Sequence, residues 1–476
     1  MNNFTYIIHL AVTSLALLLG VLLRNKVRFL QKYLIPASLI GGFFLLLFYN
    51  FVGPHIGLTN DFLGDLVYHL LNISFISMML RIPETSAKKK SKAVKQNVIA
   101  LASQYGFQCL LGLLVTALMI HTFAPGLSPA FGYTLALGFE LGPGQAYSMS
   151  LPWESMGFSG ASSVGLAMAA TGFLVGSVGG VILINIAIRR KWLSQEQIDK
   201  LHSREVKTSF VSSDHKPGAI LTTNSEAIDS FTYHIALVGM TYLLSYGVLS
   251  LISYLLSFFG SMGVELAESL WGINFVFSVF SAIIVRKIMV AFNLEKSIDN
   301  LTLNRINGLA VDFTVCASLG AIVLSSISQY WLPILILIVT GIGITCFLLP
   351  WYCSRLFTDN QFYRTLMIFG TATGTLPTGM SLLRIVDPDF ETPVAQDFVY
   401  ATGIMLPLAI PIILTINLPA FSVTKGKPIL FWAAVGISAL YAIISIIFYV
   451  VMAKKRSFAD KSKFFFVDRA TRNEVK

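Results

Sequence analysis

The sequence predicts an all-α polytopic membrane protein whose two halves cross the bilayer with opposite polarity. Of its 476 residues, 55% are hydrophobic and only 12% are charged, and many apolar runs reach the roughly 20 residues that a membrane-spanning helix needs. Lys and Arg concentrate in alternate loops, which predicts the direction of each span. Two Gly- and Pro-rich interruptions lie roughly half a chain apart, at corresponding positions of the two halves.

The first half is expected to contain five spans. Basic residues crowd the loop at 24–32, so this loop is expected to be cytoplasmic and the N-terminus outside. The first apolar run has no basic residue before it and no small-residue cleavage site after it, so we interpret it as a retained span. The expected spans lie at about 6–23, 35–52, 62–80, 97–120 and 161–188.

The first interruption reads GFELGPGQA at 138–146 and includes the acid Glu140. Three glycines and a proline make it a poor helix interior. Broken backbone at membrane depth is tolerated only where protein or a water-filled cavity satisfies its polar groups. We therefore expect a re-entrant hairpin at about 130–156 that enters from outside, although a Gly-rich helix contact would have a similar composition.

The second half repeats this order after a hydrophilic segment, 189–230, which is expected to be a cytoplasmic linker. Its loop at 260–268 has no basic residue and is expected outside, and an amphipathic connector is expected at 293–307. The second interruption, GTATGTLPTG at 370–379, predicts a hairpin at about 366–386 that enters from the cytoplasm. The expected spans lie at about 232–259, 270–285, 308–327, 331–352 and 394–418.

The order of spans predicts an inverted-topology repeat, with five spans and one hairpin in each half. The expected units are a first repeat at 1–188, the linker at 189–230, a second repeat at 231–420, and an extra span with a basic cytoplasmic tail at 421–476. The chain is expected in the cytoplasmic (inner) membrane as a multi-pass protein with its C-terminus inside. Its net charge of +10 reflects loop charge and does not indicate a nucleic-acid partner.

The hairpin tips are the predicted binding site. Half-helix N-termini attract anions, exposed carbonyls suit a desolvated cation, and glycine lets a ligand approach the backbone closely. Hydroxyl groups at the second tip can donate to a carboxylate or coordinate Na⁺, although each could instead bond its own helix. The candidate substrate-binding residues at the tips are Gly142, Gly144, Gln145, Gly374, Thr375, Pro377 and Thr378.

Three charged residues near the tips are further candidates. Arg384 follows the second tip, and its guanidinium could bind a substrate carboxylate through two parallel hydrogen bonds, or reach the inner interface or pair with Asp387. Asp312 and Glu140 are candidate Na⁺ ligands or proton carriers. Asp312 could instead be paired within the scaffold, and Glu140 could pair with Arg384. No cofactor is expected beyond Na⁺ as the coupling ion.

The four cysteines, Cys109, Cys316, Cys346 and Cys353, lie in or at the edge of apolar runs without metal-ligand spacing. We interpret them as small buried hydrophobic residues and expect no disulfide framework.

Several motifs resemble the sodium/glutamate symporter family. They are FLQKYLIP at 29–36 followed by Gly41-Gly42, the glycines of the fifth span, and GTLPTG at 374–379. The resemblance covers nearly the whole chain apart from the linker and the tail. It implies an elevator-type secondary transporter with two re-entrant hairpins whose tips meet near mid-membrane, and it implies a homodimer. The first hairpin departs from the family, which usually has Gly-Gly-His-Gly-Thr where this chain has Leu141-Gly142-Pro143-Gly144-Gln145.

These observations favour a Na⁺-coupled symporter of a small carboxylate or amino acid, such as glutamate. One alternative is H⁺ coupling through Glu140 or Asp312. Another is a membrane-embedded hydrolase, but Asp312 has no clear partner acid and the histidines lie near span ends or far from the tips. We therefore expect no enzymatic activity. No nucleotide-binding loop is present in the sequence, which disfavours primary active transport by this chain alone.

Overall fold

The computed structural model describes residues 4–82, 92–190, 192–193, 220–222, 226–387, 392–460 and 463–465. All regular structure within these ranges is helical, and ten helices there are long and apolar enough to cross a membrane. The four cysteines are free, and three of them are buried. The prediction of a polytopic helical protein is therefore confirmed, and the burial of Cys109, Cys316 and Cys353 agrees with the prediction of buried cysteines.

All five spans predicted in the first half are helical. The fifth passes through a π-helical segment, Val175–Gly179, without a break in the helix. The first ends with Arg24 and Lys26 in its last turn, where cations complement the helix dipole. The helices of this half are α1 (Thr5–Lys26), α2 (Arg28–Lys32), α3 (Ala37–Leu47), α4 (Asp61–Leu80), α5 (Lys92–Thr122), α9 (Ala161–Leu174) and α10 (Gly180–Arg189).

Four of the five spans predicted in the second half, and the extra span, correspond to helices that could cross a membrane; the span predicted at 308–327 is the helix Asn300–Gly320, which is not among the ten. Pro407 and Pro411 lie inside α21, and α22 continues the same path. The helices are α12 (Ser230–Ser257), α13 (Gly260–Gly272), α14 (Asn274–Ala291), α15 (Asn300–Gly320), α16 (Leu324–Ser328), α17 (Trp331–Ile342), α18 (Leu349–Leu356), α21 (Val394–Thr415), α22 (Leu418–Thr424) and α23 (Ile429–Ala453).

Two boundaries in this half differ from the prediction. The expected outer loop at 260–268 belongs to helix α13. The connector expected at 293–307 is largely the start of α15, which begins at Asn300 because the carboxylate of Asp299 caps it by accepting from the backbone N–H groups of Leu301 and Thr302. Polar residues in its first turns keep α15 out of the set of ten most apolar helices.

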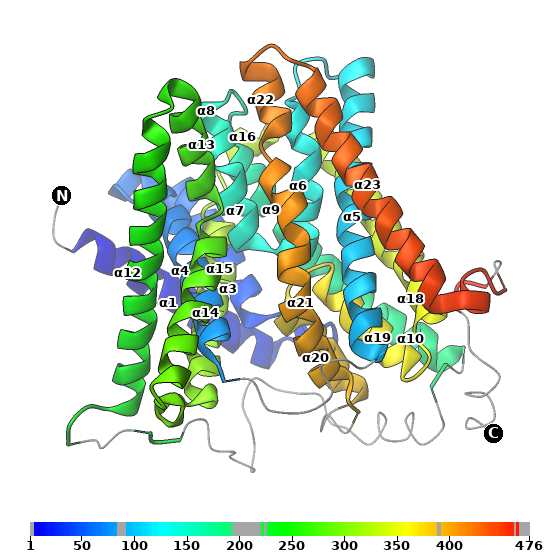
Figure 1. The fold of residues 1–476 in the computed structure, drawn as a ribbon, viewed down its shortest axis with the longest axis horizontal. Coiled ribbons are helices and arrows are strands. Elements are labelled where there is room, and N and C mark those ends of the chain that lie inside the picture. The colour runs from blue at the N-terminus through cyan, green and yellow to red at the C-terminus, as the bar shows by residue number, and fades with distance from the viewer. Residues whose placement is uncertain are drawn as a thin grey trace.

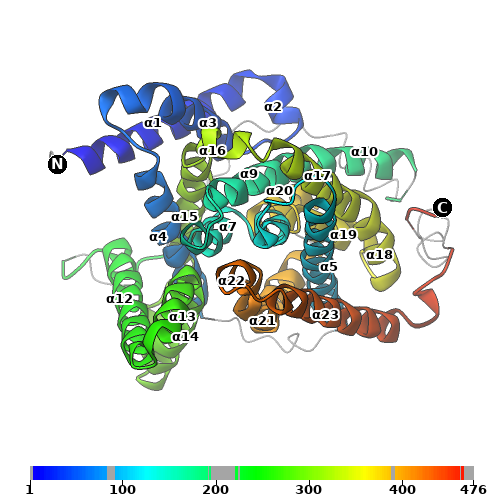
Figure 2. The ribbon, with the colours of Figure 1, turned by 90° about the horizontal axis from the view of Figure 1, so that it is seen from above.

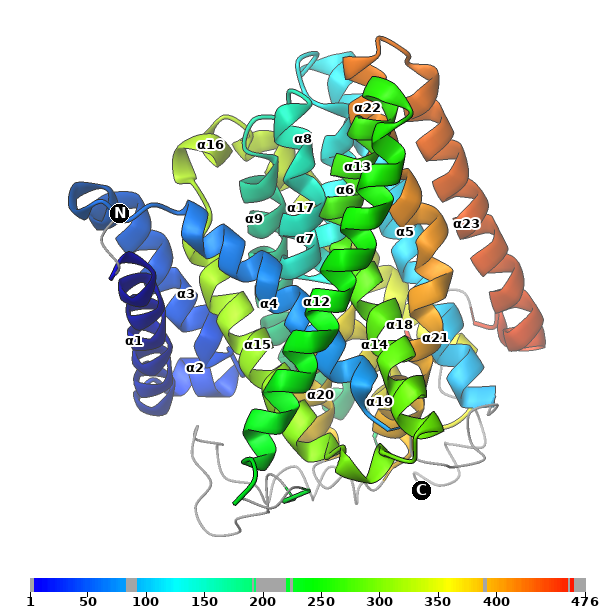
Figure 3. The ribbon, with the colours of Figure 1, turned by 60° about the vertical axis from the view of Figure 1, so that its left-hand side comes forward.

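Corresponding helices of the two halves run in opposite directions (Figures 1 and 3). In Figure 1, α1 and α4 run downward, whereas α12 and α15 run upward. Likewise α5 runs upward and α17 with α18 runs downward. The extra helix α23 runs downward, and its end lies on the same lower side as the start of α12.

The helices are arranged in groups around the pair formed by α4 and α15 (Figure 2). Seen from above, α1 and α3 lie at one edge and α12 to α14 at another, while α5, α9, α17 to α20 and α21 to α23 form the largest group. Between these groups α4 and α15 pack along each other. Helix α3 packs on α1 and on α15, and α14 packs on α12 and on α4. The second span of each half therefore packs on the third span of the other half.

Candidate functional site

Two helical hairpins carry the predicted tips. The first comprises η4 (Pro129–Gly132), α6 (Tyr133–Ala136), η5 (Leu137–Leu141), α7 (Pro143–Ser150) and α8 (Pro152–Ser155). The second comprises α19 (Gln361–Thr371) and α20 (Leu376–Val386). In each, the returning helix begins with a proline in its first turn, Pro143 or Pro377, where the missing N–H breaks no helical hydrogen bond. The first hairpin descends from the upper side of Figure 1 and the second rises from the lower side.

The two tips touch each other. Gly142 has φ +89° and ψ −179°, a backbone conformation that is essentially restricted to glycine. A Cβ atom placed on Gly142 would lie 2.9 Å from Cγ2 of Thr375 and 3.4 Å from the carbonyl oxygen of Gly374. A larger residue here would therefore both strain the backbone and push the second tip away.

A cavity of about 260 Å³, which we call the tip cavity, lies beside this contact. Both tips contribute to it, together with α4, α5, α14, α15 and α21. Its polar lining residues are Ser74, Tyr105, Glu140, Gln145, Asn307, Thr314, Thr371, Thr375 and Thr402. Its larger apolar residues include Leu71, Phe75, Met78, Met79, Leu101, Phe275 and Met405.

Two polar atoms of the tip cavity have no hydrogen-bond partner within the described residues. These are Oε2 of Glu140 and Oγ1 of Thr314. Tyr105, whose hydroxyl lies within hydrogen-bonding distance of Cys109, is fully buried and Thr314 is only 6% exposed, so protein packing shields both from bulk water. A buried polar group without a partner costs free energy, so Glu140 and Thr314 are exceptions to the usual pairing of buried polar groups.

Among the described residues that line the tip cavity, Glu140 is the only one with a charged side chain. Tyr105, Cys109 and Tyr441 lie close enough to Glu140 to interact with it electrostatically. Of these, Tyr441 comes from the extra helix α23, which packs along α5. The cavity therefore carries a carboxyl group and no basic side chain within the described ranges.

Helix α5 contributes to the site, and the sequence did not predict this contribution. Nε2 of Gln108 donates to the carbonyl oxygen of Ala372, directly before the second tip, at 3.2 Å. Gln104 and Gln108 are both buried, and Nε2 of Gln104 and Oε1 of Gln108 have no partner in the described part of the chain. Two amides and a tyrosine inside a strongly apolar span are a signal that could have been used, since polar residues there are costly.

A second cavity of about 330 Å³, the Asp312 cavity, also borders the second tip. Thr375 and Pro377 line both cavities. The Asp312 cavity also contains Arg24 of α1, and hydroxyl groups from Ser38, Ser177, Thr378 and Ser381. Ser38 lies within interaction distance of the carboxylate of Asp312. A carboxylate and several hydroxyl groups are oxygen ligands of the type that a hard cation prefers.

The predicted site residues are thus divided between three places. Gly144, Gln145 and Glu140 line the tip cavity, and Thr378 and Asp312 line the Asp312 cavity. Gly142 and Gly374 form the contact between the tips. Arg384 has an exposed side chain near the end of α20 and lines neither cavity. No group of three or more His, Cys, Asp or Glu side chains in the described ranges could hold a metal ion.

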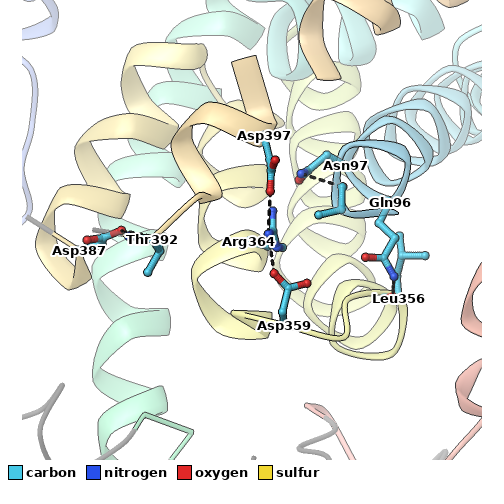
Figure 4. A network of polar contacts seen from close by, with 9 residues as sticks. Gln96, Asn97, Leu356, Asp359, Arg364, Asp387, Thr392 and Asp397 are labelled. Atoms are coloured by element: carbon cyan, nitrogen blue, oxygen red, sulfur yellow. Dashed lines mark hydrogen bonds and ion pairs between the residues drawn. The ribbon is translucent and has the colours of Figure 1, made fainter. Parts of the chain in front are cut away.

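A buried ion-pair network fixes the base of the second hairpin (Figure 4). Arg364 of α19 is fully buried, and its Nη2 lies 2.9 Å from Oδ2 of Asp397 in the first turn of α21 and 2.6 Å from Oδ2 of Asp359. Asp387, at the end of α20, accepts from the backbone N–H of Thr392 at 3.1 Å. The pairing with Asp397 joins two helices and depends on the tertiary fold, so no local sequence pattern indicates it.

A family model for the sodium/glutamate symporters matches residues 3–355 of the chain. The match includes the first hairpin and ends before α19, so the second hairpin lies outside it. No curated protein and no solved structure is significantly similar to the chain. Because the match extends over well more than half of the sequence and agrees with the helical membrane fold, the chain belongs to the sodium/glutamate symporter family.

Proposed function

We propose that the protein is a Na⁺-coupled secondary transporter of a small amino acid or carboxylate that binds in the tip cavity. The carrying observation is that the two hairpins meet, through Gly142 and Thr375, beside a cavity lined with unpaired polar atoms. Hairpins from opposite faces that converge on one cavity are the arrangement of an alternating-access transporter, because either hairpin can then separate the ligand from one side. The family is one of transporters, which supports this function over hydrolysis.

The inverted repeat and an elevator-type movement are part of the proposal. They are supported by the opposite directions of corresponding helices and by the exchange in which α3 packs on α15 while α14 packs on α4. The repeat boundaries at 188, 230 and 420 remain predictions. If the hairpin group moves against α1 and α3, a bis-maleimide crosslink between Ser38→Cys and Ser381→Cys, which line the same cavity, should stop transport without unfolding the protein.

The coupling Na⁺ is proposed to bind at the Asp312 cavity, with help from tip carbonyl groups. Uptake of radiolabelled amino acids into proteoliposomes, with and without an inward Na⁺ gradient, tests the proposal directly. Asp312→Asn should reduce the Na⁺ dependence of uptake more than the affinity for substrate. If substrate accumulation is independent of the Na⁺ gradient and depends on a pH gradient, the result would favour H⁺ coupling, the second candidate function.

That second candidate is H⁺ coupling. One observation favours it: the carboxyl group of Glu140 has a buried oxygen without a described partner and is surrounded by the weakly acidic side chains of Tyr105, Cys109 and Tyr441. Such a carboxyl group could carry a proton across the membrane. Loss of H⁺-driven uptake in Glu140→Gln, with Na⁺ having no effect in the wild type, would support it.

The orientation, the location in the inner membrane and the homodimer are also proposed. Cysteine labelling from outside is expected at Gly126→Cys, in the loop before the first hairpin, and not at Lys296→Cys, before α15; both positions are exposed. The reverse pattern would invert the orientation. Crosslinking in native membranes would test the dimer.

A further inference from the structure

The tip cavity combines one acid with an apolar wall. Glu140 is the only charged residue among the described residues that line it, whereas α4, α14 and α21 contribute Leu71, Phe75, Phe275 and Met405. Methionine side chains adapt to differently shaped apolar groups. The wall therefore suits an uncharged, apolar part of a ligand, and the acid suits a cationic group.

A dicarboxylate fits this lining poorly. It would bring two negative charges into the same cavity as Glu140, and no described lining residue offers a positive charge in return. A buried charge without a counter-charge is strongly unfavourable. A bound Na⁺ could neutralise one negative charge, but a second carboxylate would remain against the apolar wall.

An ammonium group fits the carboxylate of Glu140. It has three N–H donors and no acceptor, whereas an ionised carboxylate only accepts. Glu140 lines the tip cavity, and its Oε2 has no hydrogen-bond partner among the described residues.

A single carboxylate can be accommodated at the opposite end of such a ligand. Helices α7 and α20 both begin at the tips, and Gly144, Gln145 and Leu376 in their first turns line the cavity. N–H groups in a first turn have no intrahelical acceptor, and the helix dipole favours an anion there. The Cα side of Gly144 is packed against the side chain of Leu71, so the N–H groups of these first turns, and not this face of Gly144, are the groups offered to an anion.

We propose that the substrate is an amino acid with an uncharged, apolar side chain, and that Glu140 binds its ammonium group. This inference rests on the proposed transport function. It assigns Glu140 to substrate recognition and leaves Asp312, which lines a different cavity, for the cation.

The test compares three probes with the full-length protein in proteoliposomes: L-leucine, isocaproate, which is leucine without its amino group, and L-glutamate. In the wild type, L-leucine should be taken up with the Na⁺ gradient. Isocaproate and L-glutamate should each compete with L-leucine uptake at least about tenfold more weakly than unlabelled L-leucine does. Isocaproate lacks the charged hydrogen bond of the ammonium group, and L-glutamate brings a second carboxylate that is left unpaired. This comparison needs no variant and therefore does not depend on the folding of a mutant.

Glu140→Gln should weaken L-leucine binding about ten- to hundredfold and leave isocaproate binding nearly unchanged. The matched control is Glu154→Gln in the same hairpin, because the carboxylate of Glu154 accepts from Ser162 and lines neither cavity. An equal loss for both probes in Glu140→Gln would overturn the inference, as would stronger competition by L-glutamate than by isocaproate. Na⁺-driven uptake of L-glutamate without L-leucine uptake would refute the inference alone, whereas no Na⁺-driven uptake of any amino acid or small carboxylate would refute the proposed function.

Discussion

Gly142 and Thr375 join the two hairpins: a Cβ atom on Gly142 would lie 2.9 Å from Cγ2 of Thr375. Gly142→Ala is therefore expected to disturb both the backbone of the first tip and the position of the second. Transport should be lost, and the melting temperature in detergent should fall. Gly57→Ala is the control, because Gly57 also has a positive φ, +74°, but open space around its Cβ position.

The control should cost about 1–2 kcal/mol, the usual penalty of a left-handed backbone for an L-residue, and transport should persist. If Gly142→Ala and Gly57→Ala have the same effect on stability and both transport normally, contact between the tips is unimportant.

The sequence predicted the hairpins well because their signals are local. Proline and glycine act on their own backbone, so Pro143 and Gly142 identify a break wherever the chain folds. Loop charge is local as well, and it predicted the alternating directions of the helices that the structure shows. The start of α15 at Asn300 was not predicted. Asp299 is a good N-cap residue, but the polar composition of the first turns indicated a connector and not the start of a span.

The remaining site residues depend on tertiary contacts that no local pattern encodes. The polar residues around Tyr105 were a local signal, but only the approach of α5 to both tips places Tyr105 at the tip cavity. Asp312 was identified as a charge inside a span, but that it lines a different cavity from Glu140 could not be read from spacing. Arg364 pairs with an acid 33 residues further along the chain.

Asp397 and Asp359 should differ sharply in their contribution to stability. Both contact Arg364, but the side chain of Asp397 is only 6% exposed and that of Asp359 is 47% exposed. Asp397→Asn removes the charge of a buried partner and is expected to lower the free energy of unfolding by about 3–5 kcal/mol. Asp359→Asn should cost less than about 1 kcal/mol. Thermal unfolding in detergent measures both, and equal losses would show that the buried pair has no special role.

Asp299 should make the N-terminal end of α15 sensitive to acid. Burial alone would raise the pKa of Asp299, but hydrogen bonds from Thr302, Ile220 and Leu301 outweigh it and hold the pKa below the ordinary value of 3.8. Since the folded-state pKa is the lower one, this stabilisation is complete above the ordinary pKa and is lost as the pH falls through the folded-state pKa.

The measurement is the melting temperature of the wild type and of Asp299→Asn across acidic and neutral pH. Asparagine is also a good N-cap, so the variant should retain the cap and lose the charge. The wild type should be the more stable at neutral pH, and the difference should shrink below the ordinary Asp range. A difference that is independent of pH would contradict the assignment.

Of the substrate-binding residues predicted from the sequence, Arg384 is the one that the structure supports least. Its exposed side chain lines neither cavity, so Arg384→Lys is expected to change substrate affinity by less than about twofold. A guanidinium that binds a carboxylate through two parallel hydrogen bonds would instead lose roughly tenfold or more on the same change, because lysine cannot reproduce the planar pair of donors. Binding measured per folded molecule distinguishes the two results.

The fully buried guanidinium of Arg355, in α18, holds the segment that follows α23. It donates to the carbonyl oxygens of Ala459 at 3.0 Å, Asp460 at 2.8 Å and Lys463 at 3.0 Å. A single ammonium group has no planar fork of donors and cannot reach all three acceptors in the same geometry. Arg355→Lys is therefore expected to release this segment, and limited proteolysis should cleave it faster than in the wild type.

The control for Arg355→Lys is Lys463→Ala, which removes an exposed ion pair with Asp460 from the same segment. Exposed pairs contribute less than about 1 kcal/mol, so cleavage in the control should remain at the wild-type rate. Faster cleavage in both variants would mean that the exposed pair holds the segment. Unchanged cleavage in Arg355→Lys would mean that packing around α23 is sufficient and that the three carbonyl contacts are dispensable.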